Sequence, residues 1–78
     1  MYYVYLLKLA NNTYYTGFAN NVEARLERHV EGSVLSTKAF RPLELVSYFS
    51  FKSKTSALKF EKYLKTGSGM AFRNKHLV

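Results

Sequence analysis

Residues 2–18 of this 78-residue chain read YYVYLLKLANNTYYTGF. Apart from Lys8, the first eight are aromatic or aliphatic on both faces that a strand would present, which is typical of a strand covered on both sides. Residues 10–13 (ANNT) have turn chemistry, because asparagine tolerates left-handed backbone better than most residues. Residues 14–18 (YYTGF) return as a second strand, so the segment predicts a β-hairpin.

A helix is expected directly after this hairpin. Asn20 or Asn21 can cap a helix that runs to about Val30, because both side chains accept hydrogen bonds from free backbone N–H groups. Val22, Leu26 and Val30 recur at i, i+4 and i+8, which predicts the buried stripe of that helix.

The remaining segments predict a loop, a third strand, a second helix and a short basic helical turn. They are expected at residues 32–42, 43–51, 53–65 and 70–76, in that order. Gly67 is expected to end the second helix in the left-handed conformation. The order β-β-α-β-α predicts a single α+β domain over residues 1–78, with a small three-stranded antiparallel sheet flanked by helices.

Composition restricts the partners and the chemistry. Twelve Lys and Arg residues stand against five acidic ones, all Glu, and the formal net charge of +7 fits a polyanion such as nucleic acid or an anionic membrane. No apolar run approaches the roughly 20 residues of a membrane span, so no membrane partner is expected. The absence of Cys excludes disulfides, thiolate nucleophiles and cysteine-ligated metals, and it suits the cytoplasm. Mechanisms that need a cluster of carboxylates are disfavoured.

One carboxylate occupies an apolar helix face. In a helix over residues 53–65, Glu61 falls between Leu58 and Leu64 on the side that packs against the core. A carboxylate there is costly unless it is paired, hydrogen-bonded or bound to a metal. The alternative to a functional role is an ion pair with Lys65 at the rim of the core.

Arg25 and His29 stand at i and i+4, on one side of the first helix. An arginine can fork onto a phosphate, and a histidine can move protons near neutral pH. The alternative is a solvated flank that covers the core. His29 and His76, without a cysteine, do not make a zinc site by their spacing.

Together these residues form an ordered set. In chain order it comprises Tyr3-Val4-Tyr5, nine intervening residues, Tyr15-Thr16-Gly17, Arg25, His29 and a helical Glu61. The set resembles the GIY-YIG nuclease family, and most closely its small single-domain branch, from Tyr3 to about Lys75. Tyr3 stands where the family name has Gly, and Thr16 stands where it has Ile. Neither position supplies a reactive group in the family.

The resemblance implies a role for each residue of the set. One metal ion, Mg²⁺ or Mn²⁺, would bind Glu61 and the scissile phosphate, with no organic cofactor. Arg25 would hold the phosphate and stabilise its growing charge. Tyr15 is then favoured to deprotonate the attacking water, while Tyr5 and His29 orient that water or relay its proton. A phenol, with an ordinary pKa of about 10, is a poor base at pH 7 unless neighbouring cations lower that pKa.

The two motif tyrosines share a face only if the hairpin loop has an odd number of residues. A two-residue Asn11-Asn12 turn would put Tyr5 and Tyr15 on opposite faces, so the resemblance predicts a three- or five-residue loop or a bulge. Gly17 has no side chain, and we expect this to let the phosphate or the metal approach the strand.

Further residues are candidates for contacts with nucleic acid. They are Lys38, Arg41, Lys65, Arg73, Asn74 and Lys75. Asn74 lies where some members of the family place a phosphate-orienting asparagine. Basic residues of this kind grip the phosphate backbone without reading its sequence, and simple solubility is the alternative for each of them.

The expected function is therefore a metal-dependent endonuclease that acts on DNA and is directed by substrate structure more than by sequence. The alternative is a nucleic-acid-binding module of the same fold with weak or no cleavage, and a structural or protein-interaction domain is a third class. Cleavage of both strands by one such site calls for a homodimer or two visits, and targeting calls for a protein partner. The sequence leaves DNA versus RNA open.

Overall fold

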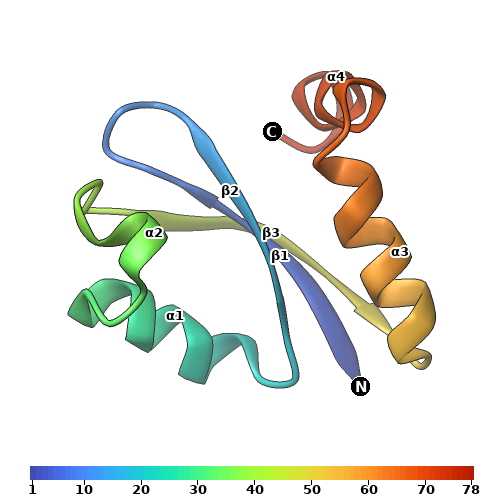
Figure 1. Cartoon of the computed structure of the whole chain (residues 1–78), viewed down its shortest axis with the longest axis horizontal. Coiled ribbons are helices and arrows are strands. Elements are labelled where there is room, and N and C mark those ends of the chain that lie inside the picture. The colour runs from blue at the N-terminus through green and yellow to red at the C-terminus, as the bar shows by residue number, and fades with distance from the viewer.

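The computed structural model describes residues 1–78, which form three strands and four helices. The elements are β1 (Tyr2–Lys8), β2 (Tyr14–Ala19), α1 (Val22–Glu31), α2 (Leu35–Lys38), β3 (Glu44–Phe51), α3 (Lys54–Leu64) and α4 (Gly67–His76). The strands pair antiparallel in the order β2-β1-β3, with α1 and α2 on one side of the sheet and α3 and α4 on the other (Figure 1). The α+β class and the antiparallel three-stranded sheet are confirmed.

The central strand β1 is buried on both of its faces. Val4 and Leu6 pack with residues of α3, whereas Tyr5 and Leu7 pack on the opposite face with residues of α1. All four side chains are at most 2 % exposed. This double burial explains why residues 2–9 show no polar alternation.

The loop between β1 and β2 has an odd number of residues, as predicted. The last pair of the ladder is Lys8 with Tyr14, so five residues separate the strands. The N–H of Leu9 donates to the carbonyl oxygen of Thr13 at 2.8 Å, and the N–H of Asn12 donates back to Leu9 at 3.0 Å. These hydrogen bonds bring Leu9 and Thr13 together, so residues 10–12 form a three-residue turn inside the five-residue loop, and Asn12, with a φ of 66°, is its left-handed last residue.

Helix α1 is rotated slightly from the predicted stripe. Asn21 is the cap, and its side chain accepts a backbone N–H three residues later at 3.0 Å. Val22 and Leu26 pack against the sheet as expected, but Val30 is 56 % exposed. His29 is fully buried in its place, because the ring finds hydrogen-bond partners on the sheet side of the helix.

The segment 32–42, predicted as a loop, contains the single helical turn α2. Thr37 lies in this turn and is fully buried. Arg41 follows it and donates to the carbonyl oxygens of Lys38 at 3.0 Å and Val30 at 3.1 Å. The Arg41 side chain therefore ties the C-terminal ends of α1 and α2 together.

The C-terminal helix is longer than predicted, and Gly67 does not end the preceding helix. Gly67 is the first residue of α4, which runs for ten residues instead of a single turn. Thr66 explains the change, because its hydroxyl donates to the Tyr63 carbonyl of α3 at 2.7 Å and accepts the Gly69 N–H of α4 at 3.1 Å. None of the helices is long and apolar enough to cross a membrane.

We expect the stability of the folded protein to depend on which residue occupies the left-handed position 12 of the hairpin loop. Asn12→Val should lower the free energy of unfolding by about 1–2 kcal/mol, because a β-branched residue is strained at positive φ. Asn12→Gly should leave it unchanged or raise it slightly. Urea denaturation of the three proteins measures both changes, and equal midpoints for the Val and Gly variants would contradict the assignment.

Candidate active site

Tyr5 and Tyr15 lie on the same face of the hairpin. Tyr5 pairs with Gly17 across the ladder and Leu7 pairs with Tyr15, so the two tyrosines are diagonal neighbours. Their ring centroids are 6.3 Å apart. The odd-numbered loop therefore has the consequence predicted for it.

The ring of Tyr5 lies directly over Gly17. A Cβ atom added at Gly17 would stand 2.2 Å from Cζ and 2.3 Å from the hydroxyl oxygen of Tyr5. We expected the missing side chain to leave room for a phosphate or a metal. In the structure that room is filled by the tyrosine ring, so Gly17 serves the packing of Tyr5.

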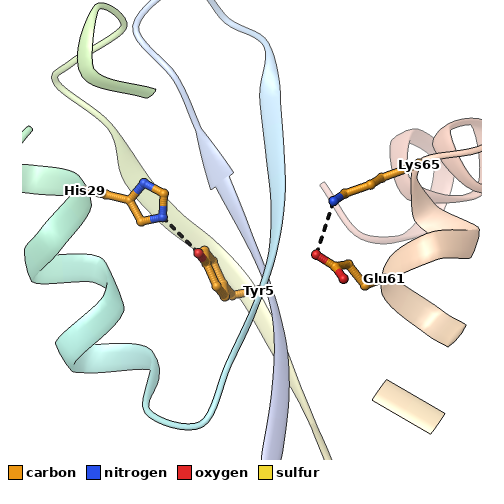
Figure 2. A network of polar contacts seen from close by, with 4 residues as sticks. All are labelled: Tyr5, His29, Glu61 and Lys65. Carbon is orange, nitrogen blue, oxygen red and sulfur yellow. Dashed lines mark hydrogen bonds and ion pairs between the residues drawn. The ribbon is translucent and has the colours of Figure 1, made fainter. Parts of the chain in front are cut away.

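His29 closes over this ring from α1. Its Nε2 is hydrogen-bonded to the Tyr5 hydroxyl at 2.8 Å, and its Nδ1 to the Thr37 hydroxyl at 2.7 Å (Figure 2 shows the first contact). Its ring also meets the ring of Tyr15 edge-on, with centroids 5.1 Å apart. A solvated flank is therefore the wrong interpretation of His29, which is a fully buried member of a polar chain.

Thr37 is a member of the cluster that the sequence did not reveal. It is fully buried, and its hydroxyl also lies 3.4 Å from the carbonyl oxygen of Val34 in the same helical turn. Its partner His29 lies eight residues earlier, in α1, whereas Thr37 itself lies beyond the end of that helix. A short polar segment contains no pattern that predicts which threonine is buried. Thr37 is buried only because the chain folds back over α1 after the end of that helix.

The buried pair titrates away from its ordinary range. Burial, with a smaller contribution from Tyr15, raises the pKa of Tyr5 to about 12. Arg25 works against this rise and Glu61 adds to it, so the Tyr5 hydroxyl lies in the field of both charges. Burial first, and then the charges of Arg25 and Arg28, lower the pKa of His29 below its usual range. At neutral pH Tyr5 is therefore protonated and His29 is uncharged.

Arg25 lies close enough to this cluster to lower the pKa of both Tyr5 and His29. It is half-buried on α1 and lines a hollow of about 320 Å³ together with Arg28 and Phe18 at the end of β2. No carboxylate of the chain pairs with it, since the one ion pair in the structure joins Glu61 and Lys65. Its guanidinium is therefore available to an anionic ligand.

Glu61 approaches the sheet from α3, on the other side of the hairpin from Tyr5 and His29 (Figure 2). Its side chain is 20 % exposed and accepts a hydrogen bond from the Lys65 ammonium at 3.2 Å, with the Lys65 side chain 56 % exposed. The structure thus shows the ion pair that the sequence offered as the alternative. Glu61 makes no direct contact with the tyrosine cluster, but its charge contributes to the raised pKa of Tyr5.

The predicted nucleic-acid contacts are not all in one place. Lys65, Arg73 and Asn74 line a hollow of about 580 Å³ that also includes Tyr14 and Tyr15. The Arg73 guanidinium stacks on the Tyr14 ring at 5.1 Å, and its Nε donates to the Asn74 side-chain oxygen at 3.1 Å. This hollow joins β2 to α4 beside one of the two motif tyrosines.

The other candidate contacts lie away from that hollow. Lys38 and Arg41 line a different hollow, of about 370 Å³, at the end of α1 and α2, and Lys75 is exposed on α4. The guanidinium of Arg41 is engaged with two backbone carbonyls, so its first role is structural. Positive charge is concentrated in the second half of the chain. Residues 52–76 carry seven Lys or Arg and one Glu, whereas residues 1–51 carry five Lys or Arg and four Glu.

Comparison with known proteins agrees with this arrangement. A family model of the GIY-YIG catalytic domain matches residues 1–74. A UPF0213 protein of Staphylococcus haemolyticus is 43 % identical over 68 residues, which cover 86 % of this chain and 83 % of that protein. A UPF0213 protein of Staphylococcus aureus strain Mu50 is 39 % identical over 66 residues, which cover 83 % and 80 %. The names of these relatives state no activity.

A solved structure has the same fold. The solution NMR structure of a UPF0213 protein from Bacillus halodurans superimposes with a TM-score of 0.60 at 28 % identity. The match covers 96 % of this chain and 84 % of the other. The sheet and helices that position the tyrosine–histidine cluster are thus shared with an experimentally determined relative.

The close contact at Gly17 predicts a cost for any side chain there. Gly17→Ala should lower the free energy of unfolding by about 1–3 kcal/mol, because the buried Tyr5 ring must move. Gly67→Ala is the matched control, since an added Cβ there meets nothing within 4 Å. Urea denaturation should separate the two variants, and a wild-type midpoint for Gly17→Ala would show that the ring can move freely.

The lowered pKa of His29 predicts a loss of stability in acid. Below the unfolded pKa of about 6.5 the unfolded chain binds a proton that the folded chain resists, so the free energy of unfolding should fall as the pH falls from there. Denaturation at pH 7.5 and pH 5.0 measures this fall. His29→Gln should reduce it, whereas His76→Gln, at an exposed position, should not. An unchanged fall in His29→Gln would contradict the assignment.

Proposed function

Because the chain belongs to the GIY-YIG catalytic domain family, we propose that it hydrolyses phosphodiester bonds in DNA as a metal-dependent endonuclease. One observation carries the proposal. The buried Tyr5 hydroxyl contacts His29, has Tyr15 as its neighbour and lies in the field of both Arg25 and Glu61. A cation, a carboxylate and a proton-accepting ring within electrostatic reach of one hydroxyl are groups that can support phosphodiester hydrolysis.

The donor set fits a metal ion that is shared with the substrate. No three His, Cys, Asp or Glu side chains of the chain form a metal-binding group, and Glu61 is the single carboxylate near the cluster. Mg²⁺ is commonly held by one or two carboxylates together with substrate phosphates and waters, so Glu61 would hold Mg²⁺ or Mn²⁺ in this way. The ion, when bound, supplies charge neutralisation at the phosphate. Lys65 covers Glu61 in this structure and is exposed enough to turn into solvent.

Arg25 is the proposed phosphate ligand. It lies on α1 and Glu61 on α3, so the two flank the hairpin from opposite sides, and β2 is the outer strand of that hairpin. A phosphate at the β2 edge would therefore face a guanidinium fork on one side and the carboxylate on the other. The guanidinium would stabilise the negative charge that grows on the phosphate oxygens as water attacks.

Three residues are proposed to handle the proton of the attacking water. Tyr15 is only half-buried, which supports its proposed role as the group that takes that proton. The proton that Tyr15 gives up would pass to the oxygen of its neighbour Tyr5 when substrate is bound, and the proton of Tyr5 would move along its hydrogen bond to Nε2 of His29. His29 is uncharged at neutral pH, so it can accept this proton, and hydroxide is left to attack phosphorus.

The substrate is proposed to lie across β2 and the α3–α4 side of the molecule. Most of the excess positive charge is there, and Lys65 and Arg73 line the hollow beside Tyr15. Such contacts hold the phosphate backbone whatever its sequence, which supports recognition by substrate structure.

A second function is supported by a specific observation. Glu61 is held by Lys65 and does not touch the tyrosine–histidine cluster, so a domain that binds nucleic acid without cutting it is the alternative. The same basic surface would serve that function. A homodimer or a protein partner that directs the domain to its target is compatible with both functions.

Cleavage assays test the proposed function. Labelled single-stranded, duplex, flap and four-way-junction DNA, and a matching RNA strand, are incubated with the protein and Mg²⁺ or Mn²⁺. We expect cleavage of at least one DNA, lost with a chelator. Glu61→Gln and Arg25→Gln should each reduce the rate by about 10²-fold or more, because each removes charge stabilisation of the transition state.

Glu27→Gln is the matched control for Glu61→Gln, because it makes the same charge change on the exposed face of α1. It should cut like the wild type, and denaturation midpoints verify that all variants are folded. Full activity in Glu61→Gln would contradict the assigned carboxylate. Absence of cleavage on every substrate, with binding that weakens steeply with salt, would support the binding module instead.

A further inference from the structure

Tyr5, His29 and Thr37 are linked by buried hydrogen bonds, and only one placement of their protons gives every donor an acceptor. An uncharged imidazole carries one N–H, and both of its nitrogens are in hydrogen bonds, to Tyr5 at 2.8 Å and to Thr37 at 2.7 Å. The two hydroxyls supply one proton each. The three protons must therefore be distributed over the hydrogen bonds within a site that water does not reach, since His29 and Thr37 are fully buried.

If the imidazole proton were on Nε2, it would point at the Tyr5 oxygen. The hydroxyl proton of Tyr5 would then need another acceptor, but this hydroxyl makes no hydrogen bond to a second acceptor in the structure, and Arg25 offers only donors. If the proton is on Nδ1, it points at Thr37, and the Thr37 hydroxyl donates in turn to the Val34 carbonyl at 3.4 Å. Nε2 then accepts the proton of Tyr5, and every donor has an acceptor.

We propose that Thr37 is a positioning residue that fixes His29 in the tautomer protonated on Nδ1. In this tautomer Nε2 faces Tyr5 as a free acceptor. In the other tautomer it would be a donor, and His29 could accept nothing from Tyr5. The inference rests on the proposed function only for its effect on cleavage, because the tautomer is a property of the free protein.

The position of Thr37 is itself held by the fold. It lies in the single turn α2, and Arg41 binds the ends of α1 and α2 through carbonyl oxygens on both. The Thr37 N–H donates to the same Val34 carbonyl that faces its hydroxyl, at 3.1 Å. The turn thus presents the Thr37 oxygen to Nδ1 as an acceptor, which is the usual way in which a neighbouring group selects a histidine tautomer.

Nitrogen NMR of the imidazole tests the proposal without reference to activity. In wild-type protein labelled with ¹⁵N-histidine, at pH 7.5, we expect the His29 proton on Nδ1, with a nuclear Overhauser contact to the Thr37 side chain. Thr37→Val, nearly isosteric, should lose this signature, and Thr37→Ser should restore it. A proton on Nε2 in the wild type, or an unchanged spectrum in Thr37→Val, would overturn the proposal.

Cleavage then gives the functional effect. Thr37→Val should cut roughly 10- to 100-fold more slowly, by analogy with the loss of the hydrogen-bond partner that orients a metal-ligating histidine, and Thr37→Ser should recover most of the rate. Thr55→Val, exposed on α3, is the control and should be unchanged. If no variant and no wild type cuts, the proposed function fails while the spectra still decide the tautomer. If Thr37→Val does not fold, the wild-type spectrum and its Overhauser contact decide.

Discussion

The hydroxyl of Tyr5 has to be satisfied in the interior, and the surrounding structure is arranged around that need. The residue lies on the central strand, whose two faces are both covered, so its hydroxyl cannot be hydrated. His29 supplies the hydrogen-bond partner of this hydroxyl. For this reason a polar ring occupies the position of α1 that faces the core. Residue 17 must then be glycine, because a Cβ atom there would overlap the Tyr5 ring. Thr37 is buried because its hydroxyl is the hydrogen-bond partner of His29 Nδ1.

The sequence predicted the parts of this arrangement that local patterns govern. The two-sided apolar run of β1, the asparagine-rich loop with its odd length and the cap of α1 all follow from backbone chemistry near each residue. It did not predict which residue of α1 faces the sheet, because Val30 is more apolar than His29 and only the contact with Tyr5 reverses their order. Thr37 was missed because its burial depends on a chain reversal between two helices, a tertiary effect that short patterns do not carry.

The sequence also named the candidate site residues, but it did not predict that they fall into two groups in space. Tyr5, Tyr15 and His29 are in contact through their rings and one hydrogen bond, whereas Glu61 lies across the hairpin with Lys65. The ion pair was foreseen from the four-residue spacing of a helix. The separation was not, because it arises from α1 and α3 packing on opposite faces of one thin sheet (Figure 1). The proposed substrate at β2 would lie between the two groups.

The contact between Tyr5 and Gly17 means that the side chains at these two positions, on different strands, share one limited volume. A side chain at residue 17 has space only if the ring at residue 5 is smaller or absent, so neither position can vary alone. Substitutions at the two should therefore be strongly non-additive. Among homologues, the same contact should appear as covariation, with a residue larger than glycine at 17 accompanied by loss of the aromatic ring at 5.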